Sequence, residues 1–494
     1  MLWTVDLEPL KDRSDWPLYR QLYEQIAQQI RTGRMARGMR LPATRELAGQ
    51  LGLNRTTIAA AYEMLEAEGL ITGQVGRGSF VKAQPEGGMP GVDWNSLLER
   101  SDSALPGHAP AAGKEAIRFG ISQPSRDLFP LDEFRAACAA VLARADLADL
   151  LQLGSPSGYE PLRRYLLEEA RRQGAAGAGD DLVITNGCQQ ALDLIGRVLL
   201  RPGDRVAIED PVYPGLKNLL SGMGAQLLAI PVFSDGVDVE FAERLLKRER
   251  PRLVVVTSNF QNPTGATLPL AARRALLAAV HATGVPVIEN DPYGELRYQG
   301  HAVASLKQLD PRGGTVLLRS FSKVSFPGLR VGWALGPKPL MERLRNAKEA
   351  SDLHTDQLSQ AVLLEFMESG RLDAHRARML AAGAERLAAT RDACRRFLPA
   401  ATRWTRPEGG MNVWVRLPAP LDASDLLPRA QKEGVAYLPG RYFEVSRRQA
   451  GALRLSFADL APEQIRRGVE ILGRVATEEI DRVDQGLEPA PAMV

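Results

Sequence analysis

The sequence predicts a multidomain protein, in which a small α+β domain is followed by a linker and a large α/β domain. Helical periodicity and then a short β-rich hairpin fill residues 16–82, whereas residues 83–116 are rich in Pro, Gly, Ala and Ser. Apolar strand segments alternate with helical segments in the rest of the chain. We therefore expect domains at 1–82 and 117–477, joined by a linker at 83–116, and a C-terminal tail at 478–494.

Composition excludes several classes of protein. The net charge of +3 decides little for 494 residues, but residues 16–82 hold nine Lys and Arg against five Glu, an excess that suits a phosphate-facing surface. The three cysteines are far apart and show no paired spacing with the histidines, which argues against a metal site or a disulfide framework. The sequence contains no apolar stretch long enough to predict a membrane span. We expect a cytoplasmic protein.

Three helices are predicted in residues 16–82. Leu18, Leu22, Ile26 and Ile30 repeat at four-residue spacing, which predicts an amphipathic helix. A second helix follows Thr44 as N-cap and a third follows Asn54 as N-cap, with a short turn between them.

A glycine-containing hairpin is predicted after the third helix. The β-rich pieces Leu70–Thr72 and Ser79–Val81 flank a turn with three glycines. Three helices followed by such a hairpin describe a winged helix-turn-helix, in which the start of the third helix enters the major groove of DNA. A three-helix packing module with surface arginines is the alternative that this pattern alone leaves open.

Specific strings in this region carry a resemblance. Leu41-Pro42-Ala43-Thr44-Arg45-Glu46-Leu47-Ala48, Asn54-Arg55-Thr56-Thr57 and Gly76-Arg77-Gly78-Ser79-Phe80-Val81 resemble the GntR-type winged helix over residues 16–82. The resemblance implies binding to double-stranded DNA, and the residues assigned to DNA contact are Arg45, Arg55, Thr56, Thr57, Tyr62, Arg77 and Gly78.

Seven strands are predicted in the large domain, at Leu182–Thr185, Val206–Glu209, Leu227–Val232, Leu253–Thr257, Val285–Asn290, Val316–Ser320 and Val331–Leu335. Because helical segments separate them, they predict a largely parallel sheet with helices on both faces. Cofactor sites in such folds gather at the carboxyl ends of the strands.

Several reactive side chains follow these predicted strands. Lys323 lies just after one strand, Asp291 and Tyr293 follow another, and Gly187 opens a helix after a third. A pyridoxal-phosphate site needs such a set: an amine for a Schiff base, an acid for the pyridine nitrogen, and donors for the phenolate and phosphate. Each feature alone has an ordinary structural explanation, such as a solvated lysine or a turn cap.

The order of these motifs resembles the fold-type I aminotransferases over most of residues 117–475. The resemblance implies that Lys323 carries the aldimine, that Asp291 pairs with the pyridine nitrogen and that Arg454 grips an amino acid's carboxylate. It also assigns the phenolate oxygen to Asn262 and Tyr293, the ring face to Tyr213, and the phosphate to Gly187, Cys188, Gln189, Ser320, Ser322 and Arg330. The sequence departs from the pattern at Leu153, where related enzymes usually carry a tyrosine that reaches the neighbouring subunit's phosphate.

A GntR-type winged helix fused to an aminotransferase-like domain resembles the MocR/GabR family of transcriptional regulators. That resemblance implies a homodimer in which pyridoxal phosphate on Lys323 is a sensor for an amine, an amino acid or the vitamer itself. A working aminotransferase with an accessory DNA-binding domain is the alternative, because the residues for transamination are present. A structural DNA-binding protein with an inactive cofactor fold is disfavoured, because Lys323 and Asp291 are both retained.

Overall fold

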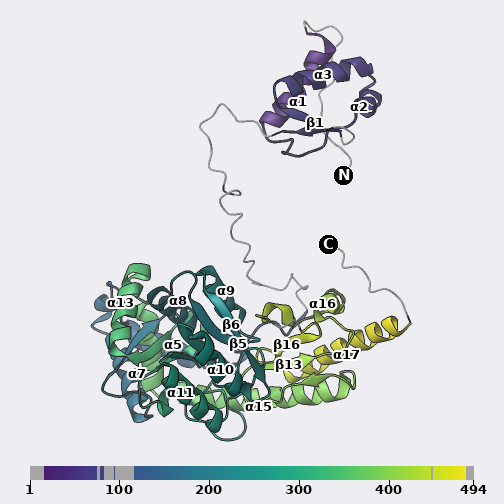
Figure 1. Ribbon diagram of the computed structural model, residues 1–494. Helices are drawn as coiled ribbons and strands as arrows, with labels where there is room; N and C mark the ends of the chain where they lie inside the picture. Colours follow the sequence, from purple (N-terminus) through teal and green to yellow (C-terminus); the bar gives the residue numbers. More distant parts are fainter. Residues whose placement is uncertain (1–15, 75–77, 83–93, 95–115, 447–448, 486–494) are drawn as a thin grey trace. The chain divides into compact units, whose positions relative to one another are not determined.

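The chain folds as two compact units. The computed structural model describes residues 16–74, 78–82, 94, 116–446 and 449–485. The first unit ends at Asp102 and the second begins at Ser103, inside the predicted linker (Figure 1). Each unit has its own hydrophobic core, so each is described separately.

The N-terminal unit is a winged helix-turn-helix. It contains α1 (Leu18–Arg31), α2 (Thr44–Leu51), α3 (Arg55–Ala67) and the antiparallel hairpin of β1 (Ile71–Gln74) and β2 (Gly78–Val81). The apolar stripe predicted for α1 is confirmed, because Leu22, Ile26 and Ile30 are buried against α3 and the hairpin.

The two predicted caps have different outcomes. Asn54 caps α3, since its side chain accepts a hydrogen bond from the N–H of Thr56 at 3.2 Å. The predicted cap at Thr44 is wrong, because Ala43 takes the N-cap position and Thr44 is already helical. The hairpin also contacts the segment between α1 and α2, because the N–H of Leu41 donates a hydrogen bond to Ser79 O at 2.9 Å.

The second unit is built around an eight-stranded sheet in the order β4-β11-β10-β9-β8-β5-β6-β7. All seven predicted strands are confirmed in this sheet. Strands β10, β9, β8, β5 and β6 run parallel, whereas β11 is antiparallel to both neighbours. The strands are β4 (Asp180–Thr185), β5 (Arg205–Asp210), β6 (Gln226–Phe233), β7 (Gly236–Val237), β8 (Leu253–Val256), β9 (Val287–Asn290), β10 (Thr315–Ser320) and β11 (Gly332–Pro337).

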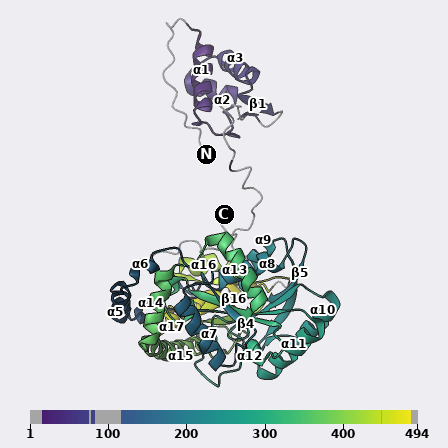
Figure 2. The same ribbon diagram turned by 90° about the vertical axis from the view of Figure 1, so that its left-hand side faces the viewer.

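Helices cover both faces of this sheet, because side chains of a strand alternate between faces. Val316 and Leu318 pack on the face covered by α8 (Cys188–Leu199), α9 (Pro214–Gly222) and α13 (Lys338–Asp352). Leu317 packs on the opposite face. That face is covered by α5 (Leu131–Leu142), α7 (Glu160–Arg172) and α14 (Gln357–Glu368), and farther along the sheet by α10 (Val239–Glu249) and α11 (Leu270–Thr283). Figure 2 shows the helices on the two sides of the strands.

A smaller second layer completes the unit. Its four-stranded sheet has the order β12-β13-β16-β15, and a two-stranded parallel pair joins β3 to β14. Helices α15 and α17 pack side by side against it (Figure 1). The elements are β3 (Ile117–Arg118), β12 (Arg403–Trp404), β13 (Asn412–Arg416), β14 (Val435–Ala436), β15 (Leu438–Pro439), β16 (Ala452–Ser456), α15 (Arg371–Phe397), α16 (Ala423–Lys432) and α17 (Pro462–Asp484), with the short helices α6 (Leu147–Leu150) and α12 (Leu306–Leu309) elsewhere in the unit.

Helix α17 continues past residue 477, where a tail was predicted, as far as Asp484. Its apolar face continues into the extension: Val469, Leu472 and Val475 are buried in the core of the smaller layer, and Ile480 packs against the same core. Among the described residues, no helix is long and apolar enough to cross a membrane.

A buried histidine makes the stability of this unit depend on pH. His375 of α15 is fully buried, and neither ring nitrogen has a hydrogen-bond partner. Its ring stacks on Phe326 at 6.0 Å between centroids. Burial, together with the nearby positive charge of Arg378, lowers the pKa of His375 to about 4. The negative charge of Glu133 has a smaller, opposite effect.

We expect the free energy of unfolding to fall as pH drops from 6.5 towards 4. In this window the unfolded chain binds a proton that the folded chain resists, so the slope from His375 approaches about 1.4 kcal/mol per pH unit at most. Chemical denaturation of wild type and His375→Phe at several pH values checks this. Phenylalanine can keep the stacking on Phe326 but cannot bind a proton. If the free energy of unfolding depends on pH equally steeply in wild type and His375→Phe, the assignment to His375 is contradicted.

Candidate cofactor and DNA sites

One pocket collects most of the side chains predicted for the cofactor. It has a volume of about 470 Å³ and lies where β4, β8, β9 and β10 end. The register places Ser320 of β10 beside Gly332 of β11, and Gly332 beside Thr185 of β4. The predicted residues that line the pocket are Cys188, Gln189, Tyr213, Asn262, Tyr293, Ser320, Ser322, Lys323, Arg330 and Arg454.

The amine of the pocket is Lys323. It ends a single 3-10 turn, Phe321–Lys323, that follows β10 directly. Its Nζ donates a hydrogen bond to the carbonyl oxygen of Ser122 at 2.6 Å and lies 5.7 Å from the ring centroid of Tyr293. A primary amine thus lines the pocket and is held by a backbone carbonyl oxygen, and no ion pair joins it to a carboxylate among the described residues.

A cradle of donors faces the start of α8. Gly187 stands at the N-cap with φ +78°, where an added Cβ would lie 2.7 Å from Nη2 of Arg330. Arg330 donates to Asn186 O at 3.0 Å and to Ser322 Oγ at 3.3 Å, and Ser322 Oγ is 2.9 Å from Ser320 Oγ. Free N–H groups of a helix start, two hydroxyls and a guanidinium form a site for a phosphate.

Cys188, the first residue of α8, is a neutral thiol. Burial raises its pKa to about 12, and the negative charge of Asp291 adds to this. Cys188 therefore supplies a weak hydrogen-bond donor rather than a nucleophile.

The buried carboxylate of Asp291 follows β9. Its two oxygens accept hydrogen bonds from Asn259 Nδ2 at 3.0 Å and from Arg319 Nη2 at 3.5 Å. Its neighbours Asn290 and Pro292 line the pocket, whereas Asp291 itself lies on the wall of a second cavity. Sequence reasoning missed Asn259 and Arg319, because neither belongs to a motif.

The opposite wall of the pocket carries Arg454 from β16. It is only 4% exposed, and it donates to Asn262 Oδ1 at 3.0 Å and to Gly120 O at 2.6 Å. Asn262 Nδ2 in turn lies 3.5 Å from the hydroxyl of Tyr293. Burial lowers the pKa of Arg454 to about 10, which still leaves a cation at neutral pH. A desolvated guanidinium in a pocket is suited to a carboxylate.

The smaller layer is held to the rim of the pocket by hydrogen bonds. Asp210, at the end of β5, accepts from the N–H groups of Val445 and Ser446, each at 3.0 Å. Lys217 donates to the carbonyl oxygens of Tyr442 and Glu444. Tyr213 comes between Asp210 and Lys217 in the sequence. It is 40% exposed, so its ring is accessible to a bound molecule.

The pocket fits the cofactor that the resemblance implies. Buried polar atoms of three lining residues have no hydrogen-bond partner, namely Gln189 Oε1, Asn290 Oδ1 and Arg454 Nε. Buried polar groups are ordinarily satisfied, so these atoms point to a polar molecule that completes the site. Residues missed by sequence reasoning also line it: Ser122, Thr257, Asn290 and Leu438.

Most of the described residues that were predicted to contact DNA are exposed or half-buried. Arg55 and Thr56 are exposed at the start of α3, Thr57 is half-buried, and Arg45 is exposed on α2. Gly78 begins β2 with φ +104°, and an added Cβ there would lie 3.1 Å from Nε of Arg40. Arg77 lies outside the described residues.

One sequence expectation changes, and one departure from the family pattern is seen in the structure. Tyr62 was assigned to DNA contact, but it is 6% exposed and its hydroxyl donates to Pro42 O at 2.9 Å. Its ring belongs to the core because α3 turns this position inward. Leu153, at the position of the expected tyrosine, is 76% exposed and brings no hydroxyl to this surface.

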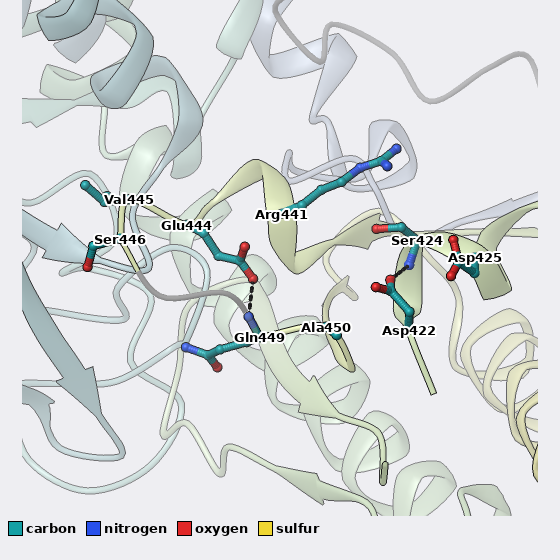
Figure 3. A pocket seen from close by; sticks show the side chains of 9 residues that line it. All are labelled: Asp422, Ser424, Asp425, Arg441, Glu444, Val445, Ser446, Gln449 and Ala450. Carbon is teal, nitrogen blue, oxygen red and sulfur yellow. Dashed lines mark hydrogen bonds between the residues drawn. The ribbon is translucent and has the colours of Figure 1, made fainter. Parts of the chain in front are cut away.

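A third concave surface holds none of the predicted residues. Figure 3 shows this pocket of about 460 Å³ in the smaller layer. There Asp422 accepts a hydrogen bond from the N–H of Ser424, and Glu444 accepts one from the N–H of Gln449 (Figure 3). These bonds close local turns, so we assign the pocket no ligand.

Comparison with known proteins agrees with both units. Residues 18–81 match the gntR family of bacterial regulatory proteins, and residues 114–472 match aminotransferase class I and II. The HTH-type transcriptional regulator TauR of Rhodobacter capsulatus is 33% identical over 92% of this chain and 96% of TauR. The probable rhizopine catabolism regulatory protein MocR of Rhizobium meliloti is 30% identical over 93% of this chain and 94% of MocR.

A solved structure bears on the cofactor. LysN, an alpha-aminoadipate aminotransferase of Thermus thermophilus complexed with N-(5'-phosphopyridoxyl)-L-leucine, is 37% identical, with a TM-score of 0.70 over 74% of this chain and 94% of LysN. With the family match, this similarity supports pyridoxal phosphate as the cofactor of the large domain. The large domain places the chain in the aminotransferase class I and II family. The gntR-type domain, and the similarity to TauR and MocR over nearly the whole chain, place it among the MocR-like transcriptional regulators.

Proposed function

We propose that this chain is a transcriptional regulator whose large domain senses an amine, an amino acid or pyridoxal phosphate itself. One observation carries the proposal: a chain with an intact winged helix also places Lys323, the phosphate cradle and Arg454 around a single pocket. When bound, pyridoxal phosphate supplies an aldehyde that condenses with primary amines. Lys323 would supply the protein's own amine for this chemistry, and an effector amine would have to enter the same pocket.

The residue roles in this proposal follow the family resemblance, and the lining of the pocket supports most of them. Lys323 would provide the amine, and Asp291 the carboxylate that keeps the pyridine nitrogen protonated. Gly187, Cys188, Gln189, Ser320, Ser322 and Arg330 hold the phosphate at the helix start. Asn262 and Tyr293 orient the phenolate oxygen, Tyr213 covers the ring, and Arg454 binds the carboxylate of an amino acid.

Ligand binding would reach the DNA through the arrangement of subunits. Loss of the bond from Lys323 Nζ to Ser122 O, or entry of a carboxylate at Arg454, changes contacts between the two layers around the pocket. A ligand that favours one arrangement of a dimer shifts its population by its difference in affinity.

A second copy of the chain is the partner that the surface suggests. Leu142, Leu151, Leu153 and Leu353 are each more than half exposed. Gln357 donates to Asp149 O and Gln152 O, and so ties the segment with two of these leucines to the start of α14. Large exposed leucines in neighbouring segments are typical of a protein interface. We place the dimer, with two winged helices on a repeated half-site, in the cytoplasm.

The alternative is a working aminotransferase with an accessory DNA-binding domain. The similarity to LysN and the complete pocket support it. Nearly full-length similarity to TauR and MocR favours regulation, because those matches include the winged helix. Transamination at ordinary enzyme rates, on the order of 1 per second or faster, together with no binding to DNA would select the enzyme.

Replacement of Lys323 tests the sensor. We expect Lys323→Ala to lose the visible absorbance that bound pyridoxal phosphate gives the wild type, and to make DNA binding insensitive to added amines. Absorbance spectra and DNA-binding titrations on the gene's own upstream region measure both effects. Lys338→Ala is the control, because Lys338 is exposed at the start of α13. If added amines change DNA binding by Lys323→Ala as they do for wild type, the proposal is contradicted.

Gly187→Ala tests the phosphate cradle. The added Cβ would meet Arg330 Nη2 at 2.7 Å, so we expect the affinity for pyridoxal phosphate to fall roughly tenfold or more, as for a lost hydrogen bond to a charged group. Gly284→Ala is the control for a positive-φ glycine outside the pocket, since at Gly284, with φ +69° and ψ 14°, an added Cβ meets no atom within 4 Å. Equal loss of cofactor affinity in both variants would contradict the role of Gly187.

Arg55→Ala tests the recognition helix. We expect its affinity for the operator to fall by about 1–3 kcal/mol, the usual cost of a lost base contact, with cofactor absorbance unchanged. Fluorescence anisotropy with labelled DNA measures the change, and Arg135→Ala, an exposed arginine of α5, is the control. If Arg55→Ala binds DNA with wild-type affinity, the proposal that the start of α3 contacts the operator is contradicted.

A further inference from the structure

A second cavity of about 490 Å³ lies on the face of the sheet opposite α8. Residues of β10 alternate between the two spaces: Ser320 lines the cofactor pocket, whereas Leu317 and Arg319 line the second cavity. Trp333 of β11, the cross-strand partner of Arg319, faces the same side. Helices α7, α14 and α15 contribute the outer wall.

Part of this cavity is apolar. The rings of Phe321 and Trp333 lie 5.1 Å apart between centroids. Around them the wall is completed by the aliphatic side chains of Leu166, Leu317, Leu335, Met367 and Leu372. Such a wall suits the hydrocarbon part of a small molecule.

Three arginines line the same cavity with buried N–H groups that lack partners. The unpartnered atoms are Arg297 Nη2, Arg319 Nε and Arg376 Nε. A buried donor without an acceptor costs about 1–3 kcal/mol, and the cofactor pocket of this chain shows the same feature at Arg454 Nε. Unpartnered donors around a shared space indicate a ligand that accepts hydrogen bonds.

The acidic side chains of the wall already face cations. Asp291 accepts from Arg319 at 3.5 Å, and Glu295 is paired with Arg376 at 2.7 Å. Asp373 is also close to Arg376, at 3.4 Å, and Glu169 forms an ion pair with Arg172. The lining therefore holds four arginines and four acidic side chains, so an incoming carboxylate would be bound by the unpartnered N–H groups rather than by a net positive charge.

We propose that this cavity is a second ligand site, for a small carboxylate with an apolar body. The carboxylate accepts hydrogen bonds from the free N–H groups of Arg297, Arg319 and Arg376, and the hydrocarbon packs against Phe321 and Trp333. Arg319 also holds Asp291 through Nη2, and the neighbours of Asp291 in the chain, Asn290 and Pro292, line the cofactor pocket. A carboxylate bound at Nε of Arg319 thus shares its guanidinium with Asp291, which links the second site to the cofactor pocket.

Calorimetric titration of the full-length, cofactor-loaded protein with 3-phenylpropanoate tests the site. This probe has a carboxylate and an aromatic ring but no amine. We expect binding by wild type, at least tenfold weaker binding of 3-phenylpropan-1-ol, and retained binding of the carboxylate in Arg454→Gln, which disables the carboxylate site of the cofactor pocket.

Two variants address the cavity itself. We expect Arg376→Gln to weaken binding of 3-phenylpropanoate at least tenfold. Val303→Trp should have the same effect by filling the half-buried rim without removing a charge, and thermal melting shows whether each variant is folded. No binding by wild type, loss of binding in Arg454→Gln alone, or full binding in Val303→Trp would each overturn the proposal. The titration needs no DNA, so its outcome is separate from that of the proposed regulation.

Discussion

The site depends on the register that joins β4, β11 and β10. Gly332 lies between Thr185 and Ser320, and a Cβ on Gly332 would come within 2.7 Å of the Cα of Gly187. The absence of a side chain there lets the start of α8 approach the end of β10. This contact places the phosphate cradle within reach of Lys323, two segments that are far apart in the sequence. A larger residue at position 332 would separate them.

The alternation of side chains along β10 gives one strand two tasks. Ser320 faces the phosphate cradle, while Arg319 faces the second cavity and holds Asp291. Asp291, whose neighbours in the chain line the cofactor pocket, is therefore held from the other side of the sheet. If both proposals hold, this contact is the route by which a ligand in one space would affect the other.

Hydrogen bonds between the layers give the pocket its rim. Asp210 and Lys217 of the large sheet region hold residues 442–446, and Arg454 reaches from β16 to Asn262 and Gly120 O. Asp210 and Arg454 are buried at this boundary between two cores, so breaking one of these contacts costs about 1–3 kcal/mol unless another group replaces the lost partner. In the proposed function a ligand carboxylate at Arg454 would be such a replacement.

The sequence alone determined the two folds and most of the site, because local periodicity, caps and ordered motifs encode strands, helices and their functional ends. It predicted seven of the eight strands of the large sheet, all but the two-residue β7, and ten residues that line the cofactor pocket. It misassigned Tyr62, whose inward direction depends on the packing of α3. Only tertiary structure revealed Asn259 and Arg319 beside Asp291, and the second cavity with its unpartnered arginines. Those contacts join segments without a shared motif, and their proximity is set by sheet register and helix packing rather than by spacing along the chain.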